Sequence, residues 1–479
     1  MQTEILYNNK KRGINSPIFA SLFPTEIMKH YTILTISFCM LLLSALASCG
    51  SGEDYTVITV SPSTCVVTNM QLGKIPCIVN IKTAEGKDSI YVASITGANY
   101  PMSIDHYGGR IFNVDSLPYG CDAAKVTFNT LASSGTLAIN SLSQEVDTFF
   151  VATDSTDFRT PRKVTVYALD GIAKRSYMLE VRVHQEEGDV FKWQEMSTGV
   201  AEFTGIEWTG ALAHEGILYA FGEENDQPVV MTALATAPTT WNKENTTHHV
   251  EAPLAYNGCF YAISKGALLQ SEDGKTWKEV PTNLSTQLLT IAAGSTALYG
   301  ITEIGFVVST DAYNWTSQKA DEPAFLPTEN CSATCLPSPI DASFEDIIVV
   351  GSRNGSPVVW KLNVDKTGTY DYTWNYYPEN PLNNNPCPEL PMRKIFAYDG
   401  GTLLLGSDVS GNSMVRLSRD NGRTWEEKHI PQSDMITSPF VATIDSNHFV
   451  WILSDNGKVL KGRYNRLGWK QQDRIFTKE

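Results

Sequence analysis

Apolar and polar residues alternate in short runs through most of the chain after residue 55. In the clearest example, Val164 and Val166 precede the dipeptide Asp170-Gly171, and Tyr177 and Leu179 follow it, each pair with a spacing of two. Because successive side chains of a β-strand point to opposite faces, this pattern predicts two strands joined by a tight Asp-Gly turn. The sequence therefore predicts an all-β protein.

A longer pattern recurs after residue 190: an apolar strand that ends in Gly or Asn, two more apolar strands, then a turn and a tryptophan. The recurring tryptophans are Trp193, Trp241, Trp277, Trp315, Trp374, Trp425 and Trp469. Their spacing fits four short strands per unit, which favours a β-propeller over a helical solenoid. Six units can be laid out. Trp193 either adds an outer strand to one of these six blades or begins a seventh.

Composition supports short strands and tight turns, because the 479 residues include 34 Gly, 20 Tyr, 19 Phe and 10 Trp. A chain of this length is expected to form two or more domains. We place an N-terminal β-domain at residues 55–185 and the propeller at 190–479. The polar segment "HQEEGD" (184–189) lies at their junction.

The hairpin segment "TDFRTPRKVTVYALDGIAKRSYMLEVRV" (156–183) resembles the closing hairpin of small immunoglobulin-like modules that are common in Bacteroidales surface lipoproteins. The resemblance implies an immunoglobulin-like β-sandwich for the N-terminal domain. Such modules act as spacers more often than as ligand-binding domains.

Two segments of the propeller, "SEDGKTW" (271–277) and "SRDNGRTW" (418–425), resemble the Asp-box repeat of sialidase-like propellers, and "STDAYNW" (309–315) is a degenerate copy. The resemblance implies that each Asp and Ser binds amides of the turn before the fourth strand, and that each Trp packs between blades. These residues are expected to be structural and not catalytic: Ser271, Asp273, Trp277, Ser309, Asp311, Trp315, Ser418, Asp420, Gly422 and Trp425.

Sialidase activity does not follow from this resemblance. A sialidase needs three arginines that converge on the substrate carboxylate, together with a tyrosine nucleophile and an acid. The predicted propeller has few arginines, and its first unit lacks the Arg-containing motif with which sialidases open. We assign no catalytic, cofactor-binding or metal-binding residue.

Residues 28–54 have the composition of a bacterial export signal: Lys29 and His30, an apolar run, then small residues and Cys49. "LASC" (46–49) resembles the bacterial lipobox, which implies that Cys49 is lipidated, with a plain secretory signal as the alternative. We assign residues 1–48 to the signal peptide, with Met28 as a possible true start, and 49–54 to the lipidated cysteine and its tether. The protein is therefore expected to be an outer-membrane lipoprotein facing the periplasm or the cell surface, attached to the membrane through this lipid alone.

Seven further cysteines follow Cys49, an odd number that leaves at least one thiol unpaired within the chain. Cys331 and Cys335 have no second pair and no nearby His, so a zinc site is not predicted. Cys387 lies in a neighbouring loop, and we predict a disulfide from Cys387 to Cys331 or Cys335.

The net charge of −15 argues against nucleic acid as a partner, because phosphate backbones would be repelled. The two longest insertions, at 321–339 and 376–391, should project from the propeller on the face away from the Asp-box turns. Aromatic rings that could stack on sugars and polar groups that could bind their hydroxyls give a candidate ligand set on the loops between and within blades. Its members are Trp208, Glu223, Asp226, Arg353, Tyr376, Tyr377, Asp408 and Asn412.

Taken as a whole, the chain resembles uncharacterised Bacteroidales lipoproteins that carry a domain of unknown function. We expect a monomeric, non-enzymatic protein for binding or adhesion, with a glycan or a surface protein as ligand. A glycan-active hydrolase or lyase and a structural subunit of an outer-membrane assembly are the alternatives.

Overall fold

A computed structural model describes residues 61–82, 87–144, 146–434, 436–437 and 439–469. Within these ranges the regular structure consists of β-strands and four short 3-10 turns, η1 (Gly97–Asn99), η2 (Ala201–Phe203), η3 (Pro323–Phe325) and η4 (Asn465–Gly468). The protein is therefore all-β, as the alternating pattern predicts. Cys49 and the whole predicted signal peptide lie outside the described residues. No helix in these ranges has the length and hydropathy needed to cross a membrane.

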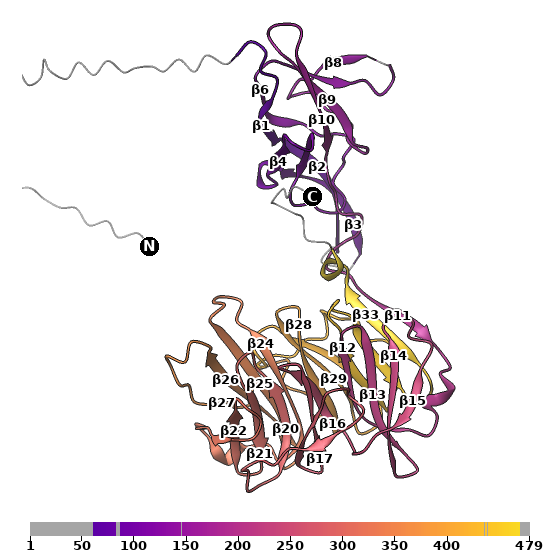
Figure 1. The fold of residues 1–479 in the computed structure, drawn as a ribbon, viewed down its shortest axis with the longest axis vertical. Helices are drawn as coiled ribbons and strands as arrows, with labels where there is room; N and C mark the ends of the chain where they lie inside the picture. The colour runs from indigo at the N-terminus through magenta and orange to yellow at the C-terminus, as the bar shows by residue number, and fades with distance from the viewer. Residues whose placement is uncertain (1–60, 83–86, 145, 435, 438, 470–479) are drawn as a thin grey trace, which may run out of the picture. The chain divides into compact units, whose positions relative to one another are not determined.

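The N-terminal domain contains a six-stranded sheet in the order β4-β5-β10-β9-β7-β8 and two two-stranded ribbons, β1-β6 and β2-β3 (Figure 1). In the large sheet β5 and β10 run parallel, whereas its other neighbours are antiparallel. The strands are β1 (Val67–Leu72), β2 (Lys74–Lys82), β3 (Asp88–Thr96), β4 (Met102–Asp105), β5 (Arg110–Asn113), β6 (Phe128–Ser133), β7 (Thr136–Asn140), β8 (Asp147–Phe149), β9 (Arg162–Tyr167) and β10 (Lys174–Glu180).

The predicted hairpin at Asp170-Gly171 is confirmed, because β9 and β10 pair antiparallel from Arg162 opposite Leu179 to Tyr167 opposite Lys174. Asp170 accepts hydrogen bonds from the amides of Ile172 and Ala173. Gly171 has φ +70°, a conformation that glycine adopts without steric cost.

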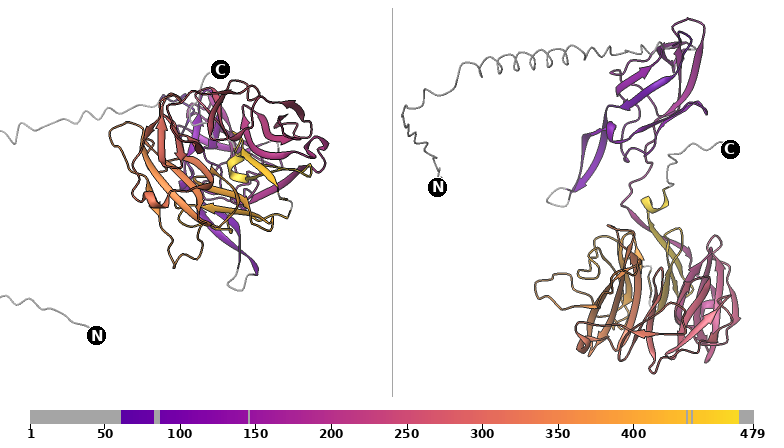
Figure 2. Two further views of the ribbon diagram at one scale, coloured as in Figure 1. Left: turned by 90° about the horizontal axis from the view of Figure 1, so that it is seen from below. Right: turned by 60° about the vertical axis from the view of Figure 1, so that its left-hand side comes forward.

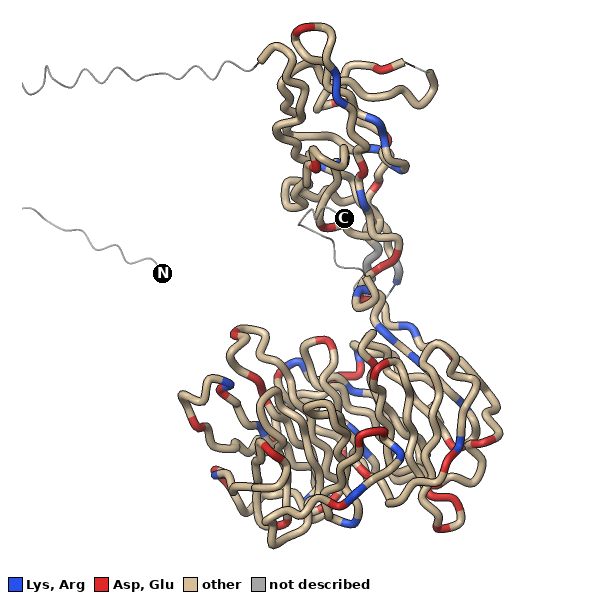
Figure 3. Tube along the Cα trace, in the orientation of Figure 1, with Lys and Arg blue, Asp and Glu red and all other residues tan. Residues whose placement is uncertain are grey.

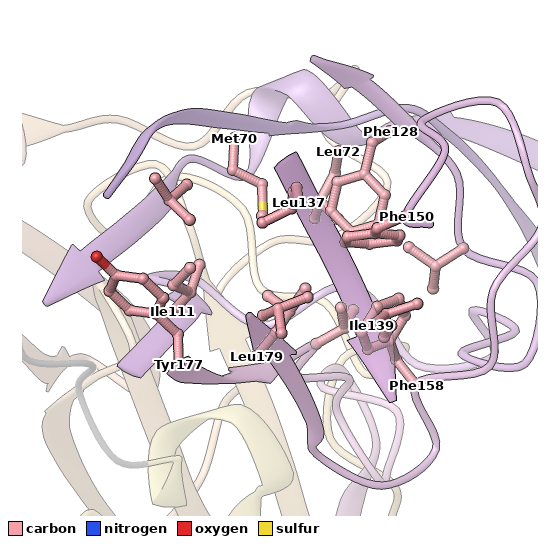
Figure 4. Packing of buried hydrophobic residues seen from close by; sticks show 14 of the residues in the cluster. Met70, Leu72, Ile111, Phe128, Leu137, Ile139, Phe150, Phe158, Tyr177 and Leu179 are labelled. Carbon is pink, nitrogen blue, oxygen red and sulfur yellow. The ribbon is translucent and has the colours of Figure 1, made fainter. Parts of the chain in front are cut away.

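One hydrophobic core serves the N-terminal domain. It joins the β1-β6 ribbon to the large sheet through Leu72, Phe128, Ile139 and Leu179, among others (Figure 4). A disulfide between the buried Cys77 and Cys121 links β2 to a connecting segment 44 residues further along the chain.

The part of the propeller domain that the structure describes forms six antiparallel sheets (Figure 1). The first is β12 (Glu207–His214), β13 (Ile217–Glu224), β14 (Gln227–Leu234) and β15 (Asn242–Asn245); the second is β16 (Glu251–Tyr256), β17 (Cys259–Ser264), β18 (Ala267–Ser271) and β19 (Lys278–Glu279); the third is β20 (Leu288–Ala293), β21 (Leu298–Thr302), β22 (Gly305–Ser309) and β23 (Thr316–Ser317). The fourth is β24 (Glu329–Pro337), β25 (Phe344–Arg353), β26 (Ser356–Asp365) and β27 (Asn375–Tyr377); the fifth is β28 (Met392–Tyr398), β29 (Gly401–Ser407) and β30 (Ser413–Ser418).

The sixth sheet joins the two ends of the domain. Its order is β31 (Phe440–Ile444), β32 (Val450–Ser454), β33 (Val459–Tyr464) and β11 (Phe191–Ser197). β11 is the first strand of the domain in the sequence, and it pairs antiparallel with the last, β33. Of the two places that the sequence allowed for Trp193, the structure shows the outer strand of an existing sheet.

Apolar side chains fill the space between every pair of successive sheets, and the last sheet packs on the first. The innermost strands also contact one another in a closed series, β12, β16, β20, β24, β28 and β31, with β31 returning to β12. Figure 2 shows the sheets distributed around a common axis. The fold is a β-propeller in which each interface between sheets has its own small core.

Candidate functional site

The turn at 418–425 shows how the predicted Asp-box residues are used. Ser418 donates a hydrogen bond to Asp420 (Oγ to Oδ1, 2.9 Å) and accepts one from the Gly422 amide at 2.8 Å. The Asp420 carboxylate also accepts the Thr424 amide and hydroxyl, each at 2.8 Å. Burial opposes ionisation of Asp420, but these hydrogen bonds outweigh it and hold its pKa below the ordinary range. The carboxylate therefore closes its own turn.

The turns at 271–277 and 309–315 have the same arrangement. Asp273 accepts the amides of Lys275 and Thr276, and Asp311 accepts those of Tyr313 and Asn314, at 2.7 to 2.9 Å. Ser271 and Ser309 each donate to the carboxylate of their own turn. Trp277, Trp315 and Trp425 are all buried in the cores between sheets.

The arginines of the propeller that the structure describes do not form a carboxylate-binding triad. Arg353 donates to the Leu326 carbonyl, and Arg393 is buried and donates to the carbonyls of Leu390 and Gly351. Arg416, Arg419, Arg463 and Arg466 likewise donate to backbone carbonyls or acidic side chains. Among the described arginines of this domain, Arg423 has neither kind of partner; its guanidinium lies over the Tyr377 ring, 4.7 Å from the centre.

A cavity of about 890 Å³ lies beside β27, between the fourth and fifth sheets. Most of its lining comes from three segments: β27 itself, the loop at 378–387, and the turn at 420–424 with Asp420, Gly422, Arg423 and Thr424. Asp321, Pro357 and Val359 complete the wall. We call it the β27 cavity. Tyr376 and Tyr377 are the two members of the predicted ligand set that line it.

The β27 cavity has a polar wall that is rich in amides. Five asparagines line it: Asn375, Asn380, Asn383, Asn384 and Asn385. Asn383 holds the loop in place by donating to the Arg423 carbonyl at 2.8 Å. Asn384 and Glu379 are exposed and make no hydrogen bond or ion pair to any part of the chain that the structure describes. Their polar groups are free to meet a ligand.

The two tyrosines already use part of their ring surfaces. Phe325 stacks on Tyr376 with ring centres 4.6 Å apart and an angle of 6° between the planes. The Arg423 guanidinium covers one face of the Tyr377 ring. A ligand would therefore meet the remaining faces, the edges and the hydroxyls of these rings.

The other six residues of the predicted ligand set lie outside the β27 cavity. Trp208 packs on Phe203 in the core between the sixth and first sheets, with ring centres 5.0 Å apart, and its indole N–H is buried without a partner. Arg353 is bound to the Leu326 carbonyl as described. Asp408 closes its own turn, because it accepts the amides of Ser410 and Asn412 and the side-chain amide of Asn412.

Glu223 and Asp226 lie at the end of β13 and in the turn that follows it. Asp226 is exposed at φ +62°. Glu223 accepts a hydrogen bond from His249 Nδ1 at 2.7 Å, and His249 Nε2 meets Glu251 at 2.7 Å. The sequence did not indicate this Glu–His–Glu contact, because its members come from two different sheets.

The two long insertions differ from the prediction. Residues 329–337 of the first insertion form β24, the innermost strand of the fourth sheet, rather than a loop. The second insertion contacts the 418–425 turn, where the Asn385 carbonyl accepts the Trp425 amide at 2.9 Å, so its predicted place away from these turns is wrong. The physical reason is that the segment after an outermost strand passes the turn of the next sheet. The same contact occurs after the second sheet, where the Asn283 side chain hydrogen-bonds the Trp315 backbone.

The predicted disulfide of Cys387 is also absent, since Cys331, Cys335 and Cys387 are free thiols in the structure. The three side chains face different surroundings. Cys387 lines the β27 cavity, and Cys335 lines the space enclosed by the innermost strands. No group of three acidic, Cys or His side chains in the described ranges is arranged to hold a metal ion.

The acidic positions of the propeller are spread over many of its turns (Figure 3).

Comparison with known proteins identifies both domains. The family model of the DUF6242 beta propeller domain matches residues 187–472, and that of the DUF6242 N-terminal domain, a domain of unknown function, matches residues 77–181. No curated protein matches the chain.

Solved structures with a similar fold are remote in sequence. They include a quinonprotein alcohol dehydrogenase-like protein from Bacteroides thetaiotaomicron (8% identity, TM-score 0.32, covering 70% of this chain and 92% of that one). A fungal lectin from Aleuria aurantia with a six-bladed propeller (9%, 0.34, 53% and 90%) and the calcium-binding protein regucalcin from Agrobacterium tumefaciens (10%, 0.37, 55% and 92%) are others. Similarity at this level does not indicate a ligand.

Proposed function

The chain belongs to the DUF6242 family, whose domains have no known function, and we propose that it is a non-enzymatic, membrane-anchored protein that binds a glycan in the β27 cavity.

The observation that carries this proposal is the chemistry of the cavity wall. Amide groups both donate and accept hydrogen bonds, and so do sugar hydroxyls. Around a volume of about 890 Å³, Asn384 offers an uncommitted amide, Glu379 an acceptor and Arg423 donors. That volume lies within the usual range of ligand sites, and it has room for more than one sugar ring.

The same wall argues against a hydrolase. A glycosidase needs a carboxylic acid whose pKa is raised, opposite a second carboxylate. Asp420 is held ionised by its own turn, and its pKa is lowered rather than raised. Asp321 is also committed, because it accepts the Tyr376 amide at 2.9 Å. Glu379 is then the one lining carboxylate without such partners, whereas a glycosidase needs two carboxyl groups. Binding without bond cleavage is the function that this set of groups supports.

A protein ligand receives less support than a glycan. A broad exposed apolar patch would favour a protein partner. Leu382 is 86% exposed at the cavity, but the asparagines, Arg423 and Glu379 surround it.

We further propose that the six sheets are six blades and that β11 completes the last of them. The closed series of contacts among innermost strands supports this count. For the N-terminal domain, the core shared by the β1-β6 ribbon and the six-stranded sheet supports a two-layer sandwich, for which the immunoglobulin-like module remains our proposal.

Membrane attachment through Cys49 is a proposal that rests on the lipobox-like sequence. Metabolic labelling with a radioactive fatty acid in the native host tests it. The wild-type chain is expected to take up the label and a Cys49→Ala variant to lose it; label retained by the variant would overturn the assignment.

A glycan array tests the binding function. We compare the full chain with Arg423→Ala and Asn384→Ala, and use Arg175→Ala, an exposed arginine on β10, as the control. The wild type and the control should bind the same glycans. Each cavity variant should bind about tenfold more weakly, the loss expected for a contact with a charged or well-placed polar group. Failure of the wild type to bind any glycan, or equal binding by all four proteins, would refute the proposal.

A further inference from the structure

A second cavity, of about 250 Å³, lies inside the ring of innermost strands. β12, β16, β20, β24, β28 and β31 all contribute to its wall, which consists largely of Ala, Ile and Leu side chains. We call it the central channel. It shares no lining residue with the β27 cavity.

Lys394, on β28, is the only charged side chain among the residues that line the central channel. Its ammonium group makes no ion pair and no hydrogen bond to any described residue. Its neighbour in the sequence, Arg393, faces a different environment, where it donates to the carbonyls of Leu390 and Gly351. Lys394 is therefore a half-buried cation without a counter-charge.

The Lys394 side chain is mostly protonated at neutral pH. Burial lowers the pKa of Lys394 to about 8, which leaves roughly nine-tenths of the ammonium in place at pH 7. The other titratable side chain on the channel wall is Cys335, and burial raises its thiol pKa to about 12. The channel thus carries a single positive charge near neutrality.

Two hydroxyl groups add hydrogen-bond donors to this wall. Thr334 Oγ1 accepts the Ala397 amide, and Thr443 Oγ1 accepts the Ala213 amide, each at 2.9 Å. These bonds use the oxygen lone pairs and leave the hydroxyl hydrogens to be donated elsewhere. The channel therefore offers an ammonium group and two hydroxyl donors beside the side chains of its alanines and isoleucines.

We propose that the central channel is a second ligand site, which takes a small organic anion with a carboxylate for Lys394 and a short apolar tail for the alanine-rich wall. Partial burial removes water from the Lys394 ammonium, and a paired anion offsets that loss. A carboxylate supplies the missing partner and accepts from the two threonine hydroxyls. The volume of the channel limits the tail to a few carbons.

The experiment uses the full chain with straight-chain carboxylates from acetate to hexanoate as probes. The lysines are reductively methylated with carbon-13 methyl groups, which preserves their charge, and the methyl signals are observed by NMR. The Lys394 signal is the one that is absent from the spectrum of Lys394→Met. We expect saturable binding of the carboxylates, which shifts this signal and raises the pKa of the Lys394 ammonium group. The neutral isostere n-butanol and the cation n-butylamine should leave the signal unchanged at the same concentrations.

Calorimetry on Lys394→Met, whose side chain has a similar length without the charge, gives the second measurement. Butyrate affinity should fall about tenfold or more, as expected for loss of a charged contact. The proposal is wrong if butyrate binds both proteins equally, or if none of the carboxylates perturbs the Lys394 signal of the wild type. If Lys394→Met does not fold, Lys394→Gln takes its place, both to identify the signal and in the calorimetry.

Discussion

At the scale of single residues, the carboxylates of the repeated turns are engaged by the chain itself. Burial opposes ionisation of Asp273, but the amides of Thr276 and Lys275 and the Ser271 hydroxyl outweigh it and lower the pKa of Asp273 to about 2. A carboxylate with these partners stabilises the folded state and has little capacity left for a substrate. Its side chain can therefore be tested as a structural element.

We predict that Asp273→Ala lowers the free energy of unfolding by about 1 to 2 kcal/mol at pH 7, because several turn amides lose their acceptor. The folded pKa is depressed, so the stabilisation is present above the ordinary value of 3.8 and is lost as the pH falls through about 2. Denaturant unfolding across this range provides the measurement. Glu272→Ala, at an exposed neighbour, is the control, and equal effects of the two substitutions would contradict the assigned role.

His249 gives a pH dependence of the opposite sign. Hydrogen bonds to Glu251 and Glu223 raise its pKa above the ordinary 6.5, despite partial burial. A raised pKa in the folded state stabilises the protein at low pH, and this contribution disappears as the pH rises through the raised value. The free energy of unfolding in urea, measured between about pH 5.5 and 8.5, should depend less on pH in His249→Gln than in the wild type. His248→Gln should retain it, and an identical profile in all three proteins would exclude the contact as the cause.

At the scale of elements, β11 matters because it closes the ring. Phe191 on β11 packs against Tyr464 of β33 with ring centres 5.3 Å apart, and it belongs to the core between the fifth and sixth sheets. Without this strand the last sheet would expose the edge of β33.

Phe191→Ala should therefore lower the free energy of unfolding by about 3 to 5 kcal/mol, the usual range for a deleted core aromatic. Lys192→Ala, on the same strand but exposed, should change it by less than about 0.5 kcal/mol. Unfolding in guanidinium chloride, monitored by tryptophan fluorescence, distinguishes the two variants. Similar midpoints for the two variants would mean that β11 does not close the ring.

The local elements could be predicted from the sequence because their signals are local. The Asp170-Gly171 hairpin and the Ser-x-Asp turns depend on residues within a few positions of one another. The β24 strand was misread as a loop because its residues, "ENCSATCLP", carry few large apolar side chains. As an innermost strand it lines the central channel, where small residues such as Ala333 fit the narrow space.

At the scale of the whole molecule, both proposed ligand sites arise from segments that are far apart in the sequence. The β27 cavity combines the loop at 378–387 with the turn at 420–424, and the central channel draws on all six sheets. Tyr376 and Tyr377 could be named in advance because two aromatics in a long insertion are conspicuous. Arg423 and Lys394 could not be named in advance, because the residues around them come from other sheets and are brought together only when the ring closes.

The central claim is that ligand binding belongs to the β27 cavity, which includes the turn at 420–424, and that the aspartates of the repeated turns serve the fold. Hydrogen–deuterium exchange of the full chain, with and without the tightest-binding glycan from the array, tests it most directly. The account predicts slower amide exchange at 375–387 and 420–424, with the turns at 271–277 and 309–315 unchanged. Slower exchange at those two turns, with no change beside β27, would contradict it.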